Sequence, residues 1–375
     1  MLHPTTYYIA LGSNKGHRFE HLQNAVNIIF NQIGNIRLIS KLYKSPALGF
    51  KSDDFFNCCL ICESHLHPTT VLNKLLDIET KLGRVRTQSG IYEARTIDLD
   101  IIFVEGETIK TPTLTVPHPE MQNRKFVLQP LNDIASTLKH PVFNKTVAEL
   151  LQACTDNSVL EPLTITLKNP GDNYDFSKFG YIAIEGNIGA GKTSLATKIA
   201  SDFNAKLILE RFADNPFLPK FYNDAQRYAF PLEMSFLADR YQQISDDLSQ
   251  LDLFKDFIVS DYDVFKSLIF SKVTLQEDEF KLYRKLFYLM YKELRKPDLY
   301  IYLYQNTERL QQNIKKRGRQ YEQNIDTGYL EKINSGYLEF LKTQTNFNIK
   351  IIDISDKDFI ANRADYLWVL GEICN

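Results

Sequence analysis

The sequence has 375 residues, of which 44% are hydrophobic and 24% charged, an ordinary globular composition that favours two domains at this length. The formal net charge of −2 excludes a global basic field of the kind that binds nucleic acid. No apolar run reaches membrane-spanning length and no signal peptide opens the chain. We therefore expect a cytoplasmic protein without membrane or nucleic-acid partners.

The first half of the sequence is predicted to alternate strands with helices. Period-two alternation marks the strands, and apolar residues spaced three and four apart mark the helices. The predicted elements are, in chain order, strand 6–14, helix 18–33, strands 36–45 and 55–66, helix 69–83, strand 96–104 and a mostly helical stretch over 126–153. This order predicts an α+β sandwich of the ferredoxin-like type over residues 1–160.

The five cysteines do not have the spacing of zinc ligands. Cys59 and Cys62 form a C-x-x-C, but they lie within the predicted strand 55–66. We therefore expect core thiols there rather than a redox or metal group.

Residues 161–179 are predicted to be a linker, because they contain the run Asn-Pro-Gly-Asp-Asn and have no sustained periodicity. After them, strands and helices alternate again. The predicted elements are strand 181–186, helix 192–203, strand 206–211, a helical segment over 217–250, strand 257–262, a helical segment over 277–296 and strands 298–304 and 349–354. This pattern predicts an α/β domain over 180–375, with a parallel sheet flanked by helices.

A phosphate-binding loop lies between the first strand and the first helix of the second half. The motif is Gly-x-x-x-x-Gly-Lys-Thr, and its glycines allow backbone N–H groups to cradle phosphates at a helix N-terminus. Lys192 supplies positive charge for the β- and γ-phosphates, and the Thr193 hydroxyl is a ligand for Mg²⁺. The expected ATP-binding residues are Gly186, Asn187, Ile188, Gly189, Ala190, Gly191, Lys192 and Thr193.

Two carboxylates end the predicted strands next to this loop. Glu210 and Asp261 would lie at the carboxyl edge of the sheet, where ligands bind and where a base for a substrate hydroxyl would sit. The polar segment 314–324 adds Arg317, Arg319 and Glu322. The arginines could close over a transferring phosphoryl group, although such a basic cluster is also typical of a solvated helix end.

Residues 180–375 resemble the deoxyribonucleoside kinases related to deoxycytidine and deoxyguanosine kinase. The resemblance rests on the P-loop, Glu210 and the segments NPFLPKFYND (215–224), FPLEMSFLADRYQQ (230–243), SDYDVFKSLIF (260–270) and KKRGRQYE (315–322). It implies a homodimer through the long helices, ATP as donor and a deoxynucleoside as acceptor. The implied roles are Glu210 as base for the 5′-hydroxyl, Tyr222 and Glu322 on the 3′-hydroxyl, Glu233 and Arg240 on the nucleobase, Asp261 in the substrate site, and Arg317 and Arg319 in a lid over ATP.

The second half departs from the family pattern at three places. Glu233 stands where the family usually has glutamine. The family triplet Asp/Glu-Arg-Ser is Asp261-Tyr262-Asp263 here, so its arginine is missing. Asn313 replaces an arginine one turn before the lid pair.

Glu233 bears on the choice of nucleobase. An ionised carboxylate only accepts hydrogen bonds, which suits the guanine N1–H and N2–H₂ groups and favours deoxyguanosine. The overall resemblance is to bacterial purine kinases, among which deoxyadenosine is the commoner assignment. We expect a purine deoxynucleoside, with deoxyadenosine first.

The segment EARTIDLDIIF (93–103) carries the chemistry of the first half. On a strand, Asp98 and Asp100 share one face roughly 7 Å apart, near enough to hold divalent cations. Arg84, Arg86 and Arg95 lie close in sequence and would neutralise a polyphosphate. A surface strand with salt-bridged arginines is the alternative explanation.

Residues 7–160 resemble 6-hydroxymethyl-7,8-dihydropterin pyrophosphokinase, a folate-pathway enzyme. The matching segments are ALGSNKGHR (10–18), SPALGF (45–50), DFFN (54–57), LLDIETKLGRVR (75–86), RTIDLDIIF (95–103) and LTVPHPEMQNRKFVLQPL (114–131). The resemblance implies Mg²⁺ on Asp98 and Asp100, stabilisation of the transferring pyrophosphoryl group by Arg84 and Arg95, and ATP contacts from Arg86, His118 and Arg124. It also implies that Asn57 bonds the pterin edge and that Phe55 and Phe126 clamp its ring, although core packing also explains the phenylalanines. One departure is YEAR (92–95), where the family usually has WGPR.

The sequence therefore predicts a bifunctional enzyme that uses Mg-ATP twice. In the first half, the dihydropterin hydroxyl attacks the β-phosphorus and AMP leaves. In the second, the deoxynucleoside hydroxyl attacks the γ-phosphorus and ADP leaves. The departures leave one alternative open, in which one half is an inactive binding or dimerisation module. An ATPase that acts on nucleic acid is disfavoured by the near-neutral charge.

Overall fold

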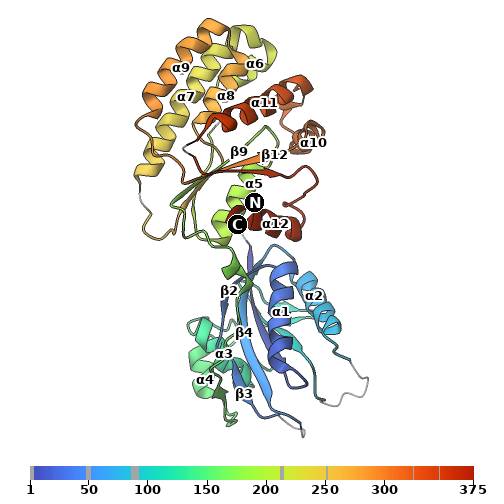
Figure 1. Cartoon of the computed structure of the whole chain (residues 1–375). Helices are drawn as coiled ribbons and strands as arrows, with labels where there is room; N and C mark the ends of the chain where they lie inside the picture. Colours follow the sequence, from blue (N-terminus) through green and yellow to red (C-terminus); the bar gives the residue numbers. More distant parts are fainter. Residues whose placement is uncertain are drawn as a thin grey trace. The chain divides into compact units, whose positions relative to one another are not determined.

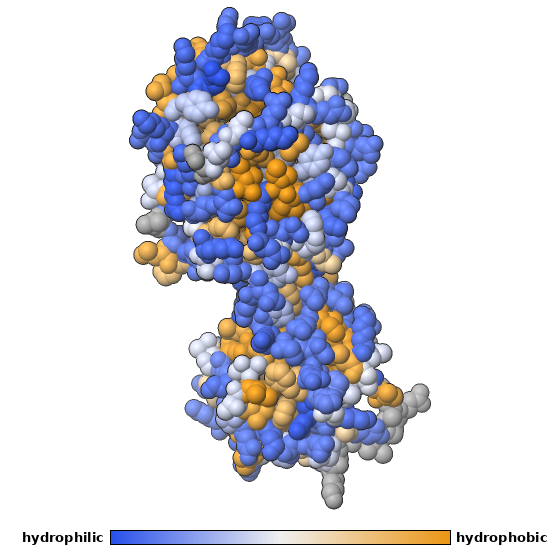
Figure 2. All heavy atoms as spheres, viewed as in Figure 1, coloured by the Kyte–Doolittle hydropathy of each residue, from blue (hydrophilic) through white to orange (hydrophobic). Residues whose placement is uncertain are grey.

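The computed structural model describes residues 4–47, 52–85, 93–211, 215–250, 252–323, 325–345 and 347–375. The chain forms two compact units, Met1–Asn173 and Tyr174–Asn375 (Figure 1). Hydrophilic side chains cover most of the face shown in Figure 2, as the composition predicts. Within the described ranges, no helix combines the length and apolar character needed to span a bilayer.

The first unit is an antiparallel sheet with helices, which confirms the predicted α+β class. Its main elements are β1 (Thr5–Ser13), α1 (Arg18–Gln32), β2 (Asn35–Ile39), β3 (Tyr43–Ser45), β4 (Phe55–Ser64), α2 (Pro68–Lys81), β5 (Asp98–Val104), α3 (Lys125–Ala135), α4 (Val147–Ala153) and β8 (Glu161–Pro162). The sheet order is β5-β1-β4-β3-β8, and β2 also pairs with β4. Every pairing in this sheet is antiparallel.

Helices cover both faces of this sheet. α1 and α2 lie on one face, and α3 and α4 lie on the other (Figure 1). Cys59 of β4 packs among the residues that contact α3, and both it and Cys62 are fully buried. Three residues apart on a strand, the two thiols point to opposite faces, so the prediction of core thiols is confirmed.

The single strand predicted at 36–45 is two strands in the structure, β2 and β3, which pair with different parts of β4. The interruption lies at Ser40. Its backbone N–H donates to the Cys59 carbonyl, and its hydroxyl accepts the Cys59 N–H at 2.9 Å. The hydroxyl thus replaces a backbone carbonyl in the ladder, and the alternation of the sequence does not reveal this.

The second unit is a parallel sheet flanked by helices, as predicted. Its elements are β9 (Tyr181–Gly186), α5 (Lys192–Asp202), β10 (Lys206–Ile208), α6 (Leu218–Asn223), α7 (Ala225–Ser249), β11 (Ile258–Ser260), α8 (Phe265–Thr274), α9 (Glu277–Tyr291), β12 (Leu299–Tyr304), α10 (Thr307–Arg317), α11 (Thr327–Thr343), β13 (Ile349–Asp353) and α12 (Arg363–Cys374). The strand order is β10-β11-β9-β12-β13, with parallel pairing throughout.

The predicted elements of the second unit differ from the structure in several places. The strands β10 and β11 have only three residues each, so Glu210 and Asp261 lie just beyond them. The helical segment over 217–250 is divided at Asp224, whose carboxylate accepts the Arg227 N–H and caps α7. The helices α8, α10, α11 and α12 are absent from the predicted elements. For α8 the reason is that its first seven residues are all buried, so that no exposed face marks the helix in the sequence.

Candidate active sites

The P-loop connects β9 to α5, as predicted. Gly189 and Gly191 have φ angles of +83° and +87°, a left-handed conformation that residues with a Cβ disfavour. The ammonium of Lys192 donates to the carbonyls of Gly186 at 2.9 Å and Asn187 at 3.0 Å. The loop therefore curls around Lys192 at the N-terminus of α5, the position where phosphate groups bind.

Two asparagines attach the P-loop to neighbouring helices. The buried Asn187 amide donates to the Leu330 carbonyl and to Oδ1 of Asn334, both at 2.8 Å. Asn313 of α10 donates to the Gly189 carbonyl at 2.9 Å. The residue that replaces the family arginine at 313 thus supports the backbone of the loop.

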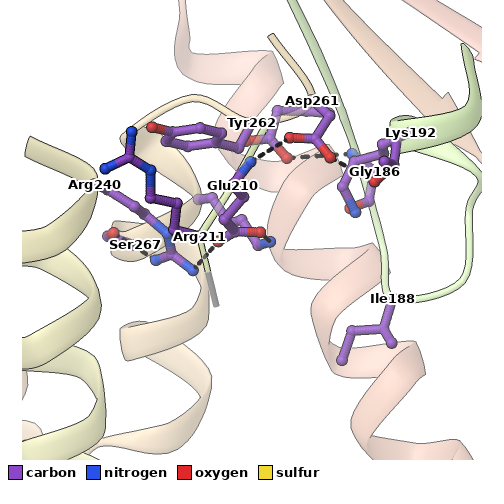
Figure 3. Close-up of polar contacts among 12 residues, drawn as sticks. Gly186, Ile188, Lys192, Glu210, Arg211, Arg240, Asp261, Tyr262 and Ser267 are labelled. Atoms are coloured by element: carbon purple, nitrogen blue, oxygen red, sulfur yellow. Dashed lines mark hydrogen bonds and ion pairs between the residues drawn. The ribbon is translucent and has the colours of Figure 1, made fainter. Parts of the chain in front are cut away.

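Glu210 lies between two cations. Oε1 contacts Arg240 of α7 at 2.7 Å, and Oε2 accepts from Lys266 of α8 at 2.6 Å. Arg240 is itself fixed by donation to the Ser267 hydroxyl at 2.7 Å (Figure 3). Burial alone would raise the pKa of Glu210, but Lys266 and Arg240 outweigh it and hold the pKa well below its ordinary value. The carboxylate is therefore ionised and can only accept hydrogen bonds.

Asp261 connects Glu210 to the P-loop. Oδ1 accepts the backbone N–H of Glu210 at 2.7 Å, and Oδ2 accepts a hydrogen bond from the Thr193 hydroxyl. Figure 3 shows Asp261 between Glu210 and Lys192. The carboxyl ends of β10 and β11 thus bring both predicted carboxylates beside the phosphate-binding loop, as expected for an open parallel sheet.

These residues line a cavity of about 110 Å³, and a second cavity of about 400 Å³ shares part of its lining. The predicted residues in the first are Ile188, Gly189, Lys192, Thr193, Glu210, Tyr222, Glu233, Arg240, Asp261, Arg317, Arg319 and Glu322. The second is lined by Gly189, Ala190, Gly191, Lys192, Thr193, Arg317 and Arg319, together with Asn313 and Phe359. Gly186 and Asn187 support the loop and line neither cavity.

Glu233 of α7 is buried in the wall of the first cavity. Oε1 accepts a hydrogen bond from the Thr274 hydroxyl, whereas Oε2 has no hydrogen-bond partner among the described residues. Burial raises the pKa of Glu233 to about 7, although Arg240 and Thr274 oppose the shift. A buried oxygen without a partner is costly, so this carboxyl group is ready to bind a polar ligand.

The predicted lid residues form one cluster. α10 ends at Arg317, and Gly318 terminates it with a φ of +76°. Arg317 and Arg319 both pair with Glu322, whose side chain is 6% exposed. The two arginine side chains are about one-third exposed and also line the cavity with Lys192. The cluster is therefore both a helix end and a wall of the site.

The first unit contains a cavity of about 560 Å³. It brings together nine of the predicted residues, namely Phe55, Asn57, Arg84, Arg95, Asp98, Asp100, His118, Arg124 and Phe126. Arg86 lies outside the described residues, as does Tyr92. The alternative of a simple surface strand does not account for a cavity of this size around Asp98 and Asp100.

Arginines surround Asp98 in this cavity. Arg84 pairs with both Glu79 and Asp98, and Arg95 contacts Oδ2 of Asp98 at 2.6 Å. Oε1 of Glu79 also accepts the Leu99 N–H at 2.9 Å, so Glu79 ties Arg84 to the start of β5. These contacts hold two guanidinium groups at the cavity wall, where they could meet phosphate oxygens.

Asp100 lies on the same face as Asp98, while Leu99 between them is buried in the core, as predicted. Burial raises the pKa of Asp100 to about 6, with further contributions from Asp98 and Glu79. A pair of carboxylates that repel each other in a buried place suits divalent cations. Opposite Asp98 on β1 is Gly12, where a Cβ would lie 3.0 Å from the Asn57 amide oxygen and narrow the site. The residues present therefore fit Mg²⁺.

The remaining predicted residues line the same cavity. Asn57 is buried and donates to the Ser45 hydroxyl at 2.8 Å, which leaves its amide oxygen facing the Gly12 backbone. Phe55 and Phe126 line the cavity, and Phe126 also packs on the hydrophobic core beside α3. Burial and the charge of Arg124 lower the pKa of His118. The wall combines flat rings with one amide, a combination that suits a flat polar heterocycle.

Two supporting residues were missed by the sequence analysis. Lys266 lies on the unpredicted helix α8 and pairs with a residue 56 positions away, so no local pattern indicates it. Glu79 could have been found: it lies four residues after Leu75 and eight after Val71, on the buried stripe of α2. An acidic residue on an apolar stripe is a signal for a buried partner.

Comparisons with known proteins find two families in the chain. Residues 182–375 match the family model of deoxynucleoside kinase, and residues 8–136 match that of 7,8-dihydro-6-hydroxymethylpterin-pyrophosphokinase. The chain is 37% identical to deoxyguanosine kinase of Bacillus subtilis over 52% of this chain and 95% of that protein. It is 32% identical to deoxyadenosine kinase of Dictyostelium discoideum, over 48% of this chain and 74% of that protein. It is 38% identical to 2-amino-4-hydroxy-6-hydroxymethyldihydropteridine pyrophosphokinase of Haemophilus influenzae, over 42% of this chain and 97% of that protein.

Proposed function

The chain belongs to the deoxynucleoside kinase family through residues 182–375 and carries a dihydropterin pyrophosphokinase domain at residues 8–136. From this premise, we propose that its kinase site phosphorylates purine deoxynucleosides, with deoxyguanosine preferred over deoxyadenosine. The two activities are pyrophosphoryl transfer to a hydroxymethyldihydropterin and phosphoryl transfer to a deoxynucleoside. Both families use ATP.

The observation that carries the choice of base is the buried, unpartnered Oε2 of Glu233. Guanine presents two donors, N1–H and N2–H₂, on one edge, and an ionised carboxylate can accept from both. The pKa of about 7 leaves a substantial ionised fraction at neutral pH. The 37% identity to a deoxyguanosine kinase supports the same choice.

Deoxyadenosine, which the overall resemblance places first, is the second candidate once the surroundings of Glu233 are considered, and it stays a candidate for a specific reason. A protonated Glu233 would accept from the adenine N6 amine and donate to N1, as a glutamine would. The raised pKa keeps part of the population protonated at neutral pH. The 32% identity to a deoxyadenosine kinase is consistent with this second activity.

In the kinase site, Glu210 would accept the hydrogen bond of the 5′-hydroxyl and later its proton. Because phosphoryl transfer has a loose transition state, orientation of the hydroxyl and charge stabilisation matter most. Lys192 would hold the β- and γ-phosphates, and Arg317 and Arg319 the charge that develops on the transferred group. Thr193 would hold Mg²⁺, which neutralises phosphate charge when bound.

The same site would bind the sugar through Tyr222 and Glu322. Glu322 contacts both lid arginines, so a 3′-hydroxyl on this carboxylate would be coupled to the position of the lid. Arg240 would keep Glu210 and the nucleobase wall at a fixed separation, since it reaches from α7 to both Glu210 and Ser267.

In the pyrophosphokinase site, the pterin would lie against Phe55, Phe126 and Asn57, with its hydroxyl directed at the β-phosphorus of ATP. Asp98 and Asp100 would hold Mg²⁺, which supplies charge to the polyphosphate when bound. Arg84 and Arg95 would stabilise the transferring pyrophosphoryl group, and His118 and Arg124 would contact ATP. Positioning and charge would carry most of the catalysis.

We also propose that the kinase unit forms a homodimer through its long helices. Leu282 and Leu289 of α9 are seven residues apart, hence on one face, and their exposures are 52% and 73%. An apolar face of this kind suits a second copy of the same helix. Light scattering on the purified chain would give twice the monomer mass if the proposal is correct.

The decisive experiment counts products. The purified chain is incubated with Mg-ATP and, in separate tubes, hydroxymethyldihydropterin, deoxyguanosine, deoxyadenosine and deoxycytidine, and AMP is separated from ADP. We expect AMP with the pterin and ADP with the purines, fastest with deoxyguanosine. ADP formation fastest with deoxycytidine would refute the purine assignment. AMP alone would make the kinase unit an inactive module, and ADP alone would do the same for the first unit.

A further inference from the structure

This inference concerns the cation beside Glu210, and it rests on the proposed kinase function. The arginine that the family carries after the first acidic residue of its triplet is Tyr262 here. The Tyr262 side chain is completely buried in the hydrophobic core, and within the part of the chain that the structure describes its hydroxyl has no hydrogen-bond partner. Position 262 therefore supplies neither a charge nor a polar contact to the cavity.

Lys266 supplies a charge from another position. It lies four residues after Tyr262, in the first turn of α8, and is 8% exposed. Its ammonium donates to Oε2 of Glu210 at 2.6 Å, and it lines the cavity together with Lys192. Arg240 holds the other oxygen of the same carboxylate. Glu210 is thus held from α7 and α8 at once.

We propose that Lys266 is the positioning residue for the catalytic carboxylate Glu210 and takes the place of the missing family arginine. Arg240 reaches Oε1 with both Nε and a terminal nitrogen, whereas Lys266 occupies one of the two acceptor sites of Oε2, so Oε2 can still accept a substrate hydroxyl. Two cations on separate oxygens fix the plane of the carboxylate. They also keep it ionised, so it stays an acceptor for the 5′-hydroxyl throughout the neutral range.

The charged groups that face Glu210 among the described residues come from three helices, and they include Glu233 of α7, whose pKa the charge of Glu210 helps to raise. Lys192 approaches from α5, Arg240 from α7 and Lys266 from α8, while Asp261 accepts the backbone N–H of Glu210. If the Lys266 charge is removed, Arg240 still contacts Oε1, but Oε2 loses its ion pair. The carboxylate can then rotate, and its affinity for a proton rises.

The test compares Lys266→Met, which keeps the length and removes the charge, with Lys266→Arg, which restores a cation. Lys272→Met is the matched control, since Lys272 lies on the same helix but is exposed and pairs with Glu339. We expect Lys266→Met to lower kcat for ADP formation by ~100-fold with little change in the KM for ATP. We also expect the acid limb of its kcat profile to move to higher pH. Lys266→Arg should recover most of kcat, and Lys272→Met should match wild type.

AMP formation by the same preparations reports whether the first unit is folded, and thermal unfolding reports on the second. Wild-type kcat and an unchanged pH profile in Lys266→Met would overturn the proposal. So would a Lys266→Arg variant that is folded but no more active than Lys266→Met, and this variant decides the question if Lys266→Met does not fold. Absence of ADP with wild type and every deoxynucleoside would instead refute the proposed kinase function.

Discussion

The hydroxyl of Thr274 donates a 3.0 Å hydrogen bond to Oε1 of Glu233, and this contact orients a carboxyl group whose other oxygen has no partner in the described ranges. Substitution of Glu233 therefore tests whether this carboxyl group selects the nucleobase. In Glu233→Gln, the amide keeps an acceptor and gains a donor, which suits adenine. We expect the ratio of kcat/KM for deoxyguanosine over deoxyadenosine to fall by ~10-fold or more, the effect of one or two hydrogen bonds.

The control for this variant is Glu339→Gln, which makes the same chemical change at an exposed residue of α11. It should leave the ratio unchanged. An unaltered ratio in Glu233→Gln would show that Glu233 does not contact the base.

The selectivity should also depend on pH. Burial raises the pKa of Glu233 to about 7, so the group is mostly protonated below that pH and mostly ionised above it. The ionised form favours guanine and the protonated form tolerates adenine. The ratio of kcat/KM for deoxyguanosine over deoxyadenosine should therefore rise as the pH increases through about 7. Initial rates with both nucleosides across this range provide the measurement, and Glu233→Gln should give a flat ratio.

Asp100→Asn should remove the first activity alone. The substitution takes away one of the two carboxylates that fit Mg²⁺, and we expect AMP formation to fall by at least ~100-fold. ADP formation should persist, since every residue proposed for it lies in the second unit. Asp77→Asn, on the exposed side of α2, is the matched control. Normal AMP formation by Asp100→Asn would contradict the proposed metal site.

Lys192→Met should give the reciprocal result. It removes the ammonium around which the P-loop is arranged, and we expect ADP formation to fall by at least ~100-fold while AMP formation stays unchanged. Lys198→Met, nearly two turns further along α5, tests whether loss of any lysine in this helix has the same effect. Parallel loss of both products from Lys192→Met would mean that the two activities share one nucleotide site.

Ser40→Ala should destabilise the first unit. The change leaves the fully buried Cys59 N–H without its acceptor, at a cost of ~1–3 kcal/mol. The midpoint of denaturant unfolding, followed by a probe of the first unit, measures the effect. Ser136→Ala, at an exposed serine after α3, should change the midpoint little. Equal midpoints for the two variants would argue against a structural role of Ser40 in the ladder.

The features that the sequence predicts well are local ones. The P-loop is a contiguous motif, and Asp98 and Asp100 are two positions apart on one strand, so spacing alone places their side chains. The ion pair between Lys266 and Glu210 joins residues 56 positions apart and depends on the crossing of α8 over the sheet edge. Periodicity could not predict α8 itself, because its first seven residues are all buried and leave no exposed polar face over most of the helix.

The break between β2 and β3 was missed for a related reason. Ser40 is compatible with a strand in the sequence, and only its contact with Cys59 shows that a side chain has replaced a backbone group. The carboxylates Glu210 and Asp261 were placed correctly, since parallel strands deliver their carboxyl ends to one edge. The cations that contact these carboxylates could not be predicted, because they are brought there by tertiary packing.

The attachment of the P-loop by Asn187, Asn313 and Lys192 has a further consequence for the kinase site. The loop is held in its curved shape by the protein's own amides and ammonium, through contacts to Leu330, Asn334 and the loop carbonyls. Its conformational entropy is therefore lost when the chain folds and need not be lost again with each nucleotide. The phosphates of ATP would meet a preorganised cradle, which favours rapid exchange of ATP and ADP over slow ordering of a flexible loop.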